Sequence, residues 1–358
     1  RNTVLSYRLR AGVHKDAPAT GIFELDTHFD LTLPAVDRDQ AGAWAEGQAG
    51  LALVIGADDS PDALIELARK SRYRILVVDE DSQRIADLRR KLHAHSAYGS
   101  RIAALQVADL DHLPLPSAYA AFVTGSDRHP APNRSQLAEV QRVQSPGGLI
   151  QWGEHTSTRG PLPGARSWGH MYGSADNSAY NGEELGGVRT VDQLDVNWLG
   201  RPGARYQSDR QNRKAAPLTS NGRLFMQGLH RVIALDAFSG QALWNVELPS
   251  MARFNVPRDC ANSCAEGEEY FLAMQGFLFE FDGEEGHIKR QIPVQAGARD
   301  DFEWDWGYVA ATPRRIVGTP VKAGAPFTAW WGGDAWYDAR EGEAAKKVCG
   351  DGIFGLDR

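Results

Sequence analysis

The 358-residue sequence has no long apolar run. Its most hydrophobic stretch, Phe271–Phe281, is interrupted by Gln275, Gly276 and Glu280, whereas a membrane-spanning helix needs about 18–20 apolar residues. It also lacks an excess of positive charge, because 39 Lys and Arg face 46 Asp and Glu, a net charge of −7. Since binding to a phosphate backbone requires a basic surface, we expect neither a transmembrane segment nor a nucleic-acid partner.

Cysteine is scarce. With three residues, Cys260, Cys264 and Cys349, the chain has no disulfide framework, and two alternatives stay open: a local bridge between Cys260 and Cys264, or three buried thiols. No His, Cys and carboxylate set has metal-ligand spacing, so we assign no metal site. The average content of hydrophobic (42%) and charged (24%) residues is typical of folded proteins, and the length predicts two or three domains.

The composition changes near residue 150, because nine of the ten Trp residues follow that point. From about 50 to 150, short apolar runs alternate with amphipathic stretches, which predicts a βαβαβ parallel sheet. Short β-type runs separated by turn residues predominate after 220. We therefore predict a connector of unknown role (1–45), an α/β Rossmann-like domain (46–152), a loop-rich connector with the first strands (153–220) and an all-β region (221–358).

Four segments of the α/β region follow a known order. Leu53–Ser60 is a strand entering a turn, Arg74–Asp79 is a strand ending in a carboxylate, Val107–Pro114 is an acidic turn, and Glu139–Gly148 is a helix with a Pro-Gly-Gly turn. Over about a hundred residues this resembles the class I S-adenosylmethionine (SAM) methyltransferases. The resemblance implies SAM as cofactor.

Carried over to this chain, the resemblance places the first cofactor turn at Gly56 and Asp58, the ribose contact at Asp79 and the adenine contact at Asp109. In the family the first turn is glycine-rich, so that backbone N–H groups approach the cofactor. Here Asp58 and Ser60 replace two of the glycines, and Asp58 brings negative charge toward the carboxylate of SAM. We therefore expect weak or no SAM binding, and the catalytic residues stay unknown.

A second motif, A-x-D-x-x-x-G-x-x-x-W, comprises Ala234, Asp236, Gly240 and Trp244. It predicts a strand, a turn capped by the Asp side chain, and a strand whose Trp packs on a neighbouring unit. This resembles the Trp-docking motif of quinoprotein β-propellers that bind pyrroloquinoline quinone (PQQ). A partial copy around Asp282 follows 46 residues after Asp236, which agrees with the length of a propeller blade, and a third begins at 354–358.

The wider chain resembles bacterial PQQ-like repeat proteins with a methyltransferase-like segment ahead of the propeller. Four motifs carry this impression: Trp168–Gly173, Pro257–Asn262, Asp305–Tyr308 and Trp336–Asp338. The resemblance implies PQQ with Ca²⁺ as a cofactor and a location in the periplasm or elsewhere outside the cytoplasm. The residues that the all-β region offers for such a site are Arg258, Asp259, Asn262 and Trp306.

Three functions compete on the sequence. A binding or scaffold protein comes first, because the first turn lacks its glycines and the chain has no Cys-Cys pair of the quinoprotein type. A PQQ-dependent oxidoreductase and a SAM-dependent methyltransferase are the alternatives. Since propellers close with about 4–8 blades of about 40–45 residues, we expect either an open arc of about three or four sheets, or a propeller that a protein partner or a further chain completes.

Overall fold

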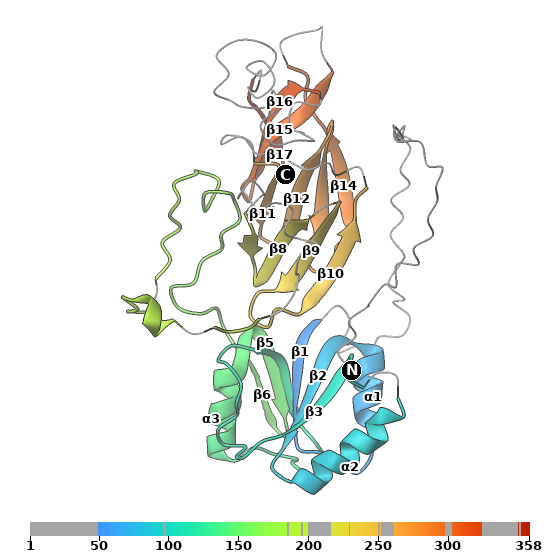
Figure 1. Cartoon of the computed structure of the whole chain (residues 1–358). Coiled ribbons are helices and arrows are strands. Elements are labelled where there is room, and N and C mark those ends of the chain that lie inside the picture. The colour runs from blue at the N-terminus through green and yellow to red at the C-terminus, as the bar shows by residue number, and fades with distance from the viewer. Residues whose placement is uncertain are drawn as a thin grey trace, which may run out of the picture.

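The computed structural model describes residues 49–95, 98–184, 186–194, 196–199, 216–228, 230–249, 251, 261–297, 303–323, 350 and 352–358 (Figure 1). An α/β domain, residues 49–158, lies below a region of antiparallel sheets, residues 218–357, which we call the sheet region. A connector, residues 159–217, joins them. The predicted N-terminal connector lies outside the described residues.

The α/β domain is built on a six-stranded sheet with the order β3-β2-β1-β4-β5-β6. Its first five strands are parallel and β6 is antiparallel to β5. The order reverses between β1 and β4, as in doubly wound nucleotide-binding folds, so the Rossmann-like prediction is confirmed. The sheet continues to Thr158, beyond the predicted boundary at 152, and its strands are β1 (Ala49–Ile55), β2 (Arg72–Asp79), β3 (Ile102–Gln106), β4 (Ala120–Gly125), β5 (Gln144–Trp152) and β6 (His155–Thr158).

Three helices cover the two faces of this sheet (Figure 1). Helices α1 (Asp62–Lys70) and α2 (Ser82–His93) pack on one face, and α3 (Arg134–Val143) packs on the other. The side chain of Asp81 caps α2, and Asn133 caps α3, which satisfies amide groups that have no partner within the helix. No helix in the described part of the chain is long and apolar enough to cross a membrane.

The described residues of the sheet region form three antiparallel sheets of four, four and three strands, and none of these sheets is closed. Each is a meander in which neighbouring strands follow one another in the sequence. Whether these sheets belong to a propeller stays a prediction. The strands are β7 (Leu218–Ser220), β8 (Arg223–Gly228), β9 (Arg231–Asp236) and β10 (Ala242–Glu247); β11 (Ser263–Glu266), β12 (Glu269–Met274), β13 (Phe277–Asp282) and β14 (Ile288–Pro293); and β15 (Trp304–Ala311), β16 (Arg315–Lys322) and β17 (Phe354–Asp357).

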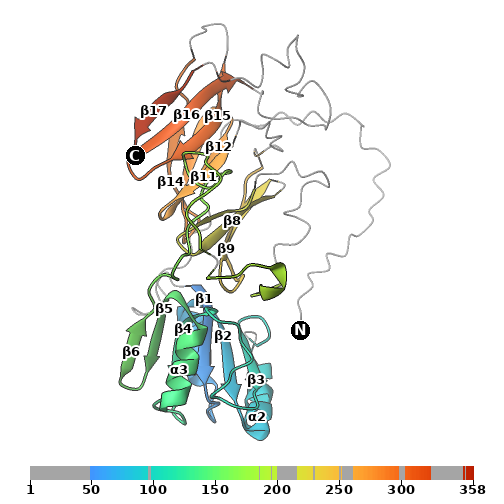
Figure 2. The same cartoon turned by 90° about the vertical axis from the view of Figure 1, so that its left-hand side faces the viewer.

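Figure 2 shows the connector, in green, running beside the sheet region. Three consecutive residues of the connector contact the first strand of each of the three sheets. Trp168 pairs with Thr219 of β7, and the Gly169 carbonyl accepts from the Ala265 amide of β11 at 2.7 Å. His170 Nε2 accepts from the Ala311 amide of β15 at 3.1 Å. The three strand residues follow one another at intervals of 46 residues, so the sheets repeat in space with the period that the sequence motif showed. The other described residues of the connector have irregular structure apart from a short 3-10 helix, Val191–Gln193.

Trp244 of β10 contacts the next sheet. Its indole Nε1 donates to the Gly283 carbonyl at 2.9 Å, and its ring stacks on Phe281 with centroids 6.2 Å apart. The ring also lies on Gly286, where a Cβ atom would come within 2.5 Å of the indole. Trp244 is 8% exposed, and burial of so large an apolar ring between two sheets stabilises their packing.

Trp198 of the connector repeats this geometry one sheet earlier. Its Nε1 donates to the Ala237 carbonyl at 3.1 Å, and its ring lies on Gly240, where a Cβ atom would come within 2.4 Å of it. Trp198 precedes Trp244 by 46 residues. The sequence did not predict this contact, because the residues around Trp198 have neither an alternating strand pattern nor an Asp-to-Gly turn like that before Trp244.

Arg72 connects the two parts of the molecule. From the start of β2, its guanidinium donates to the Leu243 carbonyl and, at 3.4 Å, to the Glu284 carbonyl. Burial lowers the pKa of Arg72, and the nearby carboxylates of Glu285, Glu284 and Asp282 oppose this change. The α/β domain therefore contacts strand β10 of one sheet and the turn between β13 and β14 of the next.

Replacing Trp244 with Ala should lower the free energy of unfolding by about 3–5 kcal/mol, because the change empties a buried site between two sheets. Phe277→Ala is the control, since Phe277 is 45% exposed and should cost well under about 1 kcal/mol. Urea unfolding measures both. A Trp244→Ala protein as stable as the control variant would show that the sheets do not depend on this contact.

The contact of His170 predicts a pH dependence. Burial lowers the pKa of His170 to about 4, whereas an unfolded His titrates near 6.5. Between these values the unfolded chain binds more protons, so the free energy of unfolding should fall as the pH drops from about 6.5 to about 4, by up to about 1.4 kcal/mol per pH unit. Urea unfolding at several pH values should show that His170→Gln removes this slope and that the exposed control His93→Gln keeps it.

Candidate functional site

The four residues predicted to bind SAM all lie at the carboxyl edge of the parallel sheet. Gly56 and Asp58 follow β1, Asp79 ends β2, and Asp109 follows β3. In open α/β sheets this edge, next to the reversal of strand order, is where ligands bind. The fold therefore brings the predicted residues to the same edge of the sheet. Whether each of them is free to bind a ligand depends on the hydrogen bonds that its side chain already forms.

Asp79 is completely buried, with 0% of the residue exposed. Its Oδ2 accepts from the Ala57 amide at 2.8 Å and from Arg84 Nε at 3.1 Å. Its Oδ1 accepts from the Asp81 amide at 2.8 Å and from Arg84 Nη2 at 2.7 Å. Burial opposes ionisation, but the bonds from Arg84 and the two amides outweigh it and hold the pKa of Asp79 below its usual value. Each carboxylate oxygen thus already accepts two hydrogen bonds.

Gly56 has φ of +91°, and the protein itself fills the space beside it. A Cβ atom on Gly56 would lie 2.2 Å from His129 Nδ1 and 2.6 Å from Ser126 Oγ. The loop after β4 therefore lies directly on the glycine that the resemblance assigns to the cofactor turn. Trp152 supports this loop, since its Nε1 donates to the His129 carbonyl at 2.5 Å.

Asp58 holds the same loop from the other side. Its carboxylate accepts from the amides of Asp127 and Arg128, each at 3.2 Å. The sequence analysis treated Asp58 as a group that repels a cofactor. The structure adds an internal role, because the carboxylate connects the turn after β1 to the loop after β4.

Asp109 is also engaged. Its Oδ2 lies 2.6 Å from His112 Nδ1, and its Oδ1 accepts from the Asp111 amide at 2.7 Å. The hydrogen bond with His112 lowers the pKa of Asp109, and the same bond raises the pKa of His112. The side chain of Asp109 is about half exposed, so it is more accessible than the buried carboxylate of Asp79.

In the sheet region, Asp236 caps the turn between β9 and β10. Its Oδ1 accepts from the amides of Phe238 and Ser239 and from the Ser239 hydroxyl. Burial raises the pKa of Asp236, although these donors and Arg223 oppose the change. Ala234 is fully buried in β9.

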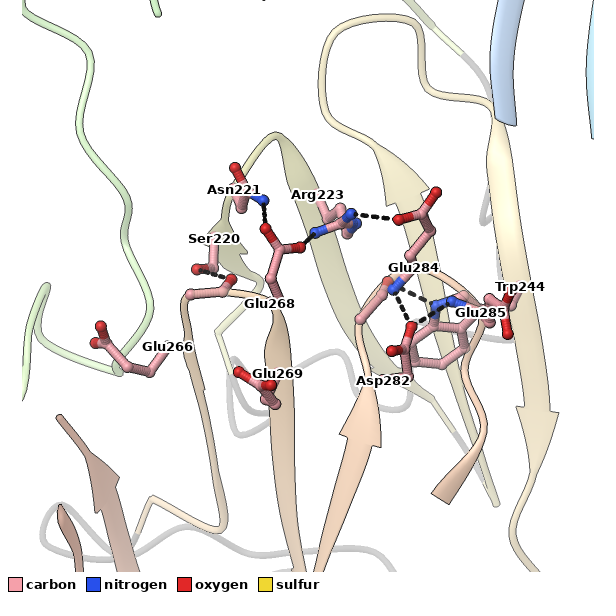
Figure 3. A network of polar contacts seen from close by, with 12 residues as sticks. Ser220, Asn221, Arg223, Trp244, Glu266, Glu268, Glu269, Asp282, Glu284 and Glu285 are labelled. Atoms are coloured by element: carbon pink, nitrogen blue, oxygen red, sulfur yellow. Dashed lines mark hydrogen bonds and ion pairs between the residues drawn. The ribbon is translucent and has the colours of Figure 1, made fainter. Parts of the chain in front are cut away.

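A related polar network joins turns of neighbouring sheets (Figure 3). Arg223 forms ion pairs with Glu268 at 2.6 Å and with Glu284 at 3.2 Å. Asp282 caps its own turn by accepting from the amides of Glu284 and Glu285 at 2.9 and 2.8 Å. The equivalent capping by Asp236 and Asp282 shows that the turn repeats as well as the strands.

Two of the four residues predicted for a propeller site lie in the interior. Asn262 is 1% exposed, and its amide group pairs with that of Gln227. Trp306 is also 1% exposed and packs edge-on against Phe354 with centroids 4.9 Å apart. Neither presents an open surface to a quinone ring. Arg258 and Asp259 lie outside the described residues.

Among the residues that the structure describes, no group of three or more His, Cys, Asp and Glu side chains has a geometry that could hold a metal ion. Cys264 is a buried free thiol, and burial raises its pKa. The predicted alternative of a local bridge between Cys260 and Cys264 is therefore wrong for this structure. Cys260 and Cys349 lie outside the described residues.

The structure shows one further feature of this edge that the sequence did not predict. A cavity of about 540 Å³ lies between α1 and strands β1 and β4, and Ser126 lines its polar end. The contributing residues come from a helix, three strands and two loops. The spacing of apolar residues along α1 is the one feature of the sequence that could have indicated this cavity. The same spacing is typical of a helix that simply packs on a sheet.

No protein-family model and no curated protein matches the chain. Solved structures similar to it include a SAM-dependent methyltransferase described as putative from Methanococcus maripaludis (23% identity, 28% of this chain, 46% of that chain, TM-score 0.26) and one from Aquifex aeolicus (17%, 33%, 64%, 0.26). A third is described as a putative sarcosine dimethylglycine methyltransferase from Galdieria sulphuraria (17%, 28%, 38%, 0.26). The chain spans less than half the length of the first and third. The strand order β3-β2-β1-β4-β5-β6 is what defines the Rossmann-like fold of this domain.

Replacing Arg84 with Ala should lower the free energy of unfolding by about 2–3 kcal/mol, because it leaves the buried Asp79 carboxylate with two donors fewer. Arg90→Ala is the matched control, since Arg90 pairs with Asp87 on the exposed side of the same helix and such pairs contribute about 0–1 kcal/mol. Urea unfolding compares the two. Equal losses would mean that Asp79 does not depend on Arg84.

Proposed function

We propose that this chain is a binding protein whose methyltransferase-like domain acts as a rigid platform and transfers no methyl group. The observation that supports this most is the state of Asp79, whose two carboxylate oxygens are occupied by Arg84 and by two backbone amides. A carboxylate that holds ribose hydroxyls must have free acceptor positions facing the ligand. Asp79 has none in this arrangement.

The other parts of the edge agree with this reading. The amide of Ala57, which lies within the first turn, donates to Asp79, and the space beside Gly56 is filled by His129 and Ser126. Asp58 places a negatively charged carboxylate where the carboxylate of the SAM amino-acid group would lie, and like charges repel. The residues present therefore do not fit SAM, and no catalytic step is derived through it.

The role of the sheet region in this proposal is to present a surface to a protein partner. Its rigid attachment through Arg72 supports a scaffold, because a partner bound on one part would be held at a fixed position relative to the other. A location outside the cytoplasm is also part of the proposal and depends on the resemblance alone.

A SAM-dependent methyltransferase is the second candidate. The strand order and the carboxylates at the ends of β2 and after β3 favour it. For this function, Asp79 would have to exchange Arg84 for the ribose, and the loop at 126–129 would have to leave Gly56. The two candidates therefore differ in whether the edge opens when SAM is added.

Calorimetric titration with SAM and with S-adenosylhomocysteine distinguishes them. We expect no measurable heat of binding for the protein or for the Arg90→Ala control. Binding in the low micromolar range would contradict the proposal. If such binding occurs and Asp79→Asn abolishes it, the methyltransferase candidate is favoured.

A further inference from the structure

The three sheets of the sheet region follow one another away from the α/β domain (Figure 2). The first sheet (β7–β10) packs on the second (β11–β14), and the second packs on the third (β15–β17). We call the side of a sheet that points to the next sheet its forward face, and the opposite side its backward face. The forward face of the first sheet carries Leu218, Phe225 and Val232. That of the second carries the residues 46 positions later, Cys264, Phe271 and Leu278.

The backward face of the first sheet is built like that of the second. The second sheet packs on the first through Tyr270, Leu272, Phe279 and Phe281. The residues 46 positions earlier are also apolar and form a cluster of their own: Leu224, Met226, Ile233 and Leu235. Among the described residues, the one member of this cluster from outside the sheet is Trp198. The first sheet thus presents an apolar face, suited to receive another sheet, on the side away from the second.

The forward face of the third sheet is exposed. On β17, Phe354 and Leu356 pack toward the second sheet, so Ile353, directly before this strand, points to the opposite side, because side chains alternate along a strand. Strands β16 and β17 pair in the register of β12 and β13, which makes Ile353 equivalent to Leu278 and Val232. Ile353 is 81% exposed, whereas Leu278 and Val232 have no exposed surface. An apolar position that is covered in the first two sheets is therefore open in the third.

The third sheet has three strands, whereas the first and second have four. The fourth strand of the first sheet, β10, carries Trp244 onto the second sheet. Residues 196–199 lie 46 positions before residues 242–245 of β10, and they carry Trp198 onto the backward face of the first sheet with the same geometry. In the part of the chain that the structure describes, they pair with no strand. These residues have the place of a fourth strand but no sheet of their own.

We propose that two copies of this chain join head to tail. The forward face of the third sheet of each copy packs on the backward face of the first sheet of the other. Residues 196–199 then lie beside β17 of the other copy and extend its sheet to four strands. The proposal names a partner for the sheet region, and in this respect it rests on the proposed binding function.

The number of copies follows from the number of sheets. Each copy contributes three sheets, and propellers close with about 4–8. Two copies supply six sheets and three copies supply nine, so a pair is the number that closes a ring within this range. Two equal contacts related by a twofold axis also leave neither apolar face open.

Sedimentation equilibrium of the whole chain tests the number of copies. We expect a species of twice the chain mass in the micromolar range and none larger. Ile353→Glu places a charge on the forward face and should raise the dimer dissociation constant at least about tenfold. Leu105→Glu is the control, because Leu105 is an exposed apolar residue of β3, and it should leave the constant unchanged. A monomer throughout the micromolar range, a larger assembly, or equal effects of the two variants would overturn the proposal.

A mixing experiment tests the head-to-tail arrangement. Met226→Glu alters the backward face as Ile353→Glu alters the forward face, and each variant alone should be mainly monomeric because both of its contacts contain one altered face. A mixed pair of the two variants keeps one contact in which both faces are native. We therefore expect the equimolar mixture to dimerise at least about tenfold more tightly than either variant alone. No gain on mixing would contradict the arrangement.

Two further measurements keep these outcomes interpretable. Far-ultraviolet circular dichroism verifies the folding of each variant, and Leu224→Gln on the same face replaces Met226→Glu if that variant does not fold. Titration with SAM, measured separately, bears on the α/β domain. A monomer that binds no SAM would overturn the head-to-tail pair alone, and a dimer that binds SAM would overturn the function proposed for the α/β domain alone.

Discussion

The buried carboxylate of Asp79 determines the arrangement of the α/β domain at its carboxyl edge. It receives hydrogen bonds from the turn after β1, from the backbone before α2 and from Arg84 within α2. A buried charge is tolerated only when it is paired and hydrogen-bonded. The folding of these three elements therefore depends on one side chain, and the same contacts remove that side chain from the surface that a nucleotide cofactor would use.

The sheet region depends on a different constraint, the repetition of one unit every 46 residues. Trp168–His170 contacts equivalent strand positions in three sheets, and Trp198 and Trp244 lie on equivalent turns. Arg72 then connects the α/β domain to two of the sheets. Both parts are thus held by contacts between elements distant in the sequence.

Much of the fold could be predicted from the sequence. Alternating apolar runs gave the parallel strands, because a buried strand and an amphipathic helix have different periods. The edge strand β6 was missed because His155–Thr158 is short and polar. Trp198 was missed because it lies in an irregular connector. Side-chain contacts such as those of His129 and Ser126 with Gly56 join two loops, and no local pattern in the sequence reports them.

For the predicted site as well, the sequence predicted the positions of the residues but not their side-chain contacts. The sequence correctly placed Gly56, Asp79 and Asp109 on neighbouring strand ends, since the carboxyl ends of parallel strands share one edge. The sequence did not show that Arg84 hydrogen-bonds to both carboxylate oxygens of Asp79. A carboxylate that binds a cofactor and a carboxylate that pairs with an arginine of its own chain require the same residue type at the same position. Only the partners of the side chain distinguish the two roles.

Hydrogen exchange at the Ala57 amide tests the closed state of this edge most directly, because that amide donates to Asp79 at 2.8 Å and adjoins the predicted cofactor turn. The account predicts that this amide is protected from exchange and that saturating SAM leaves its rate unchanged. A change in its exchange rate on addition of SAM, absent in the Asp79→Asn variant, would contradict the account.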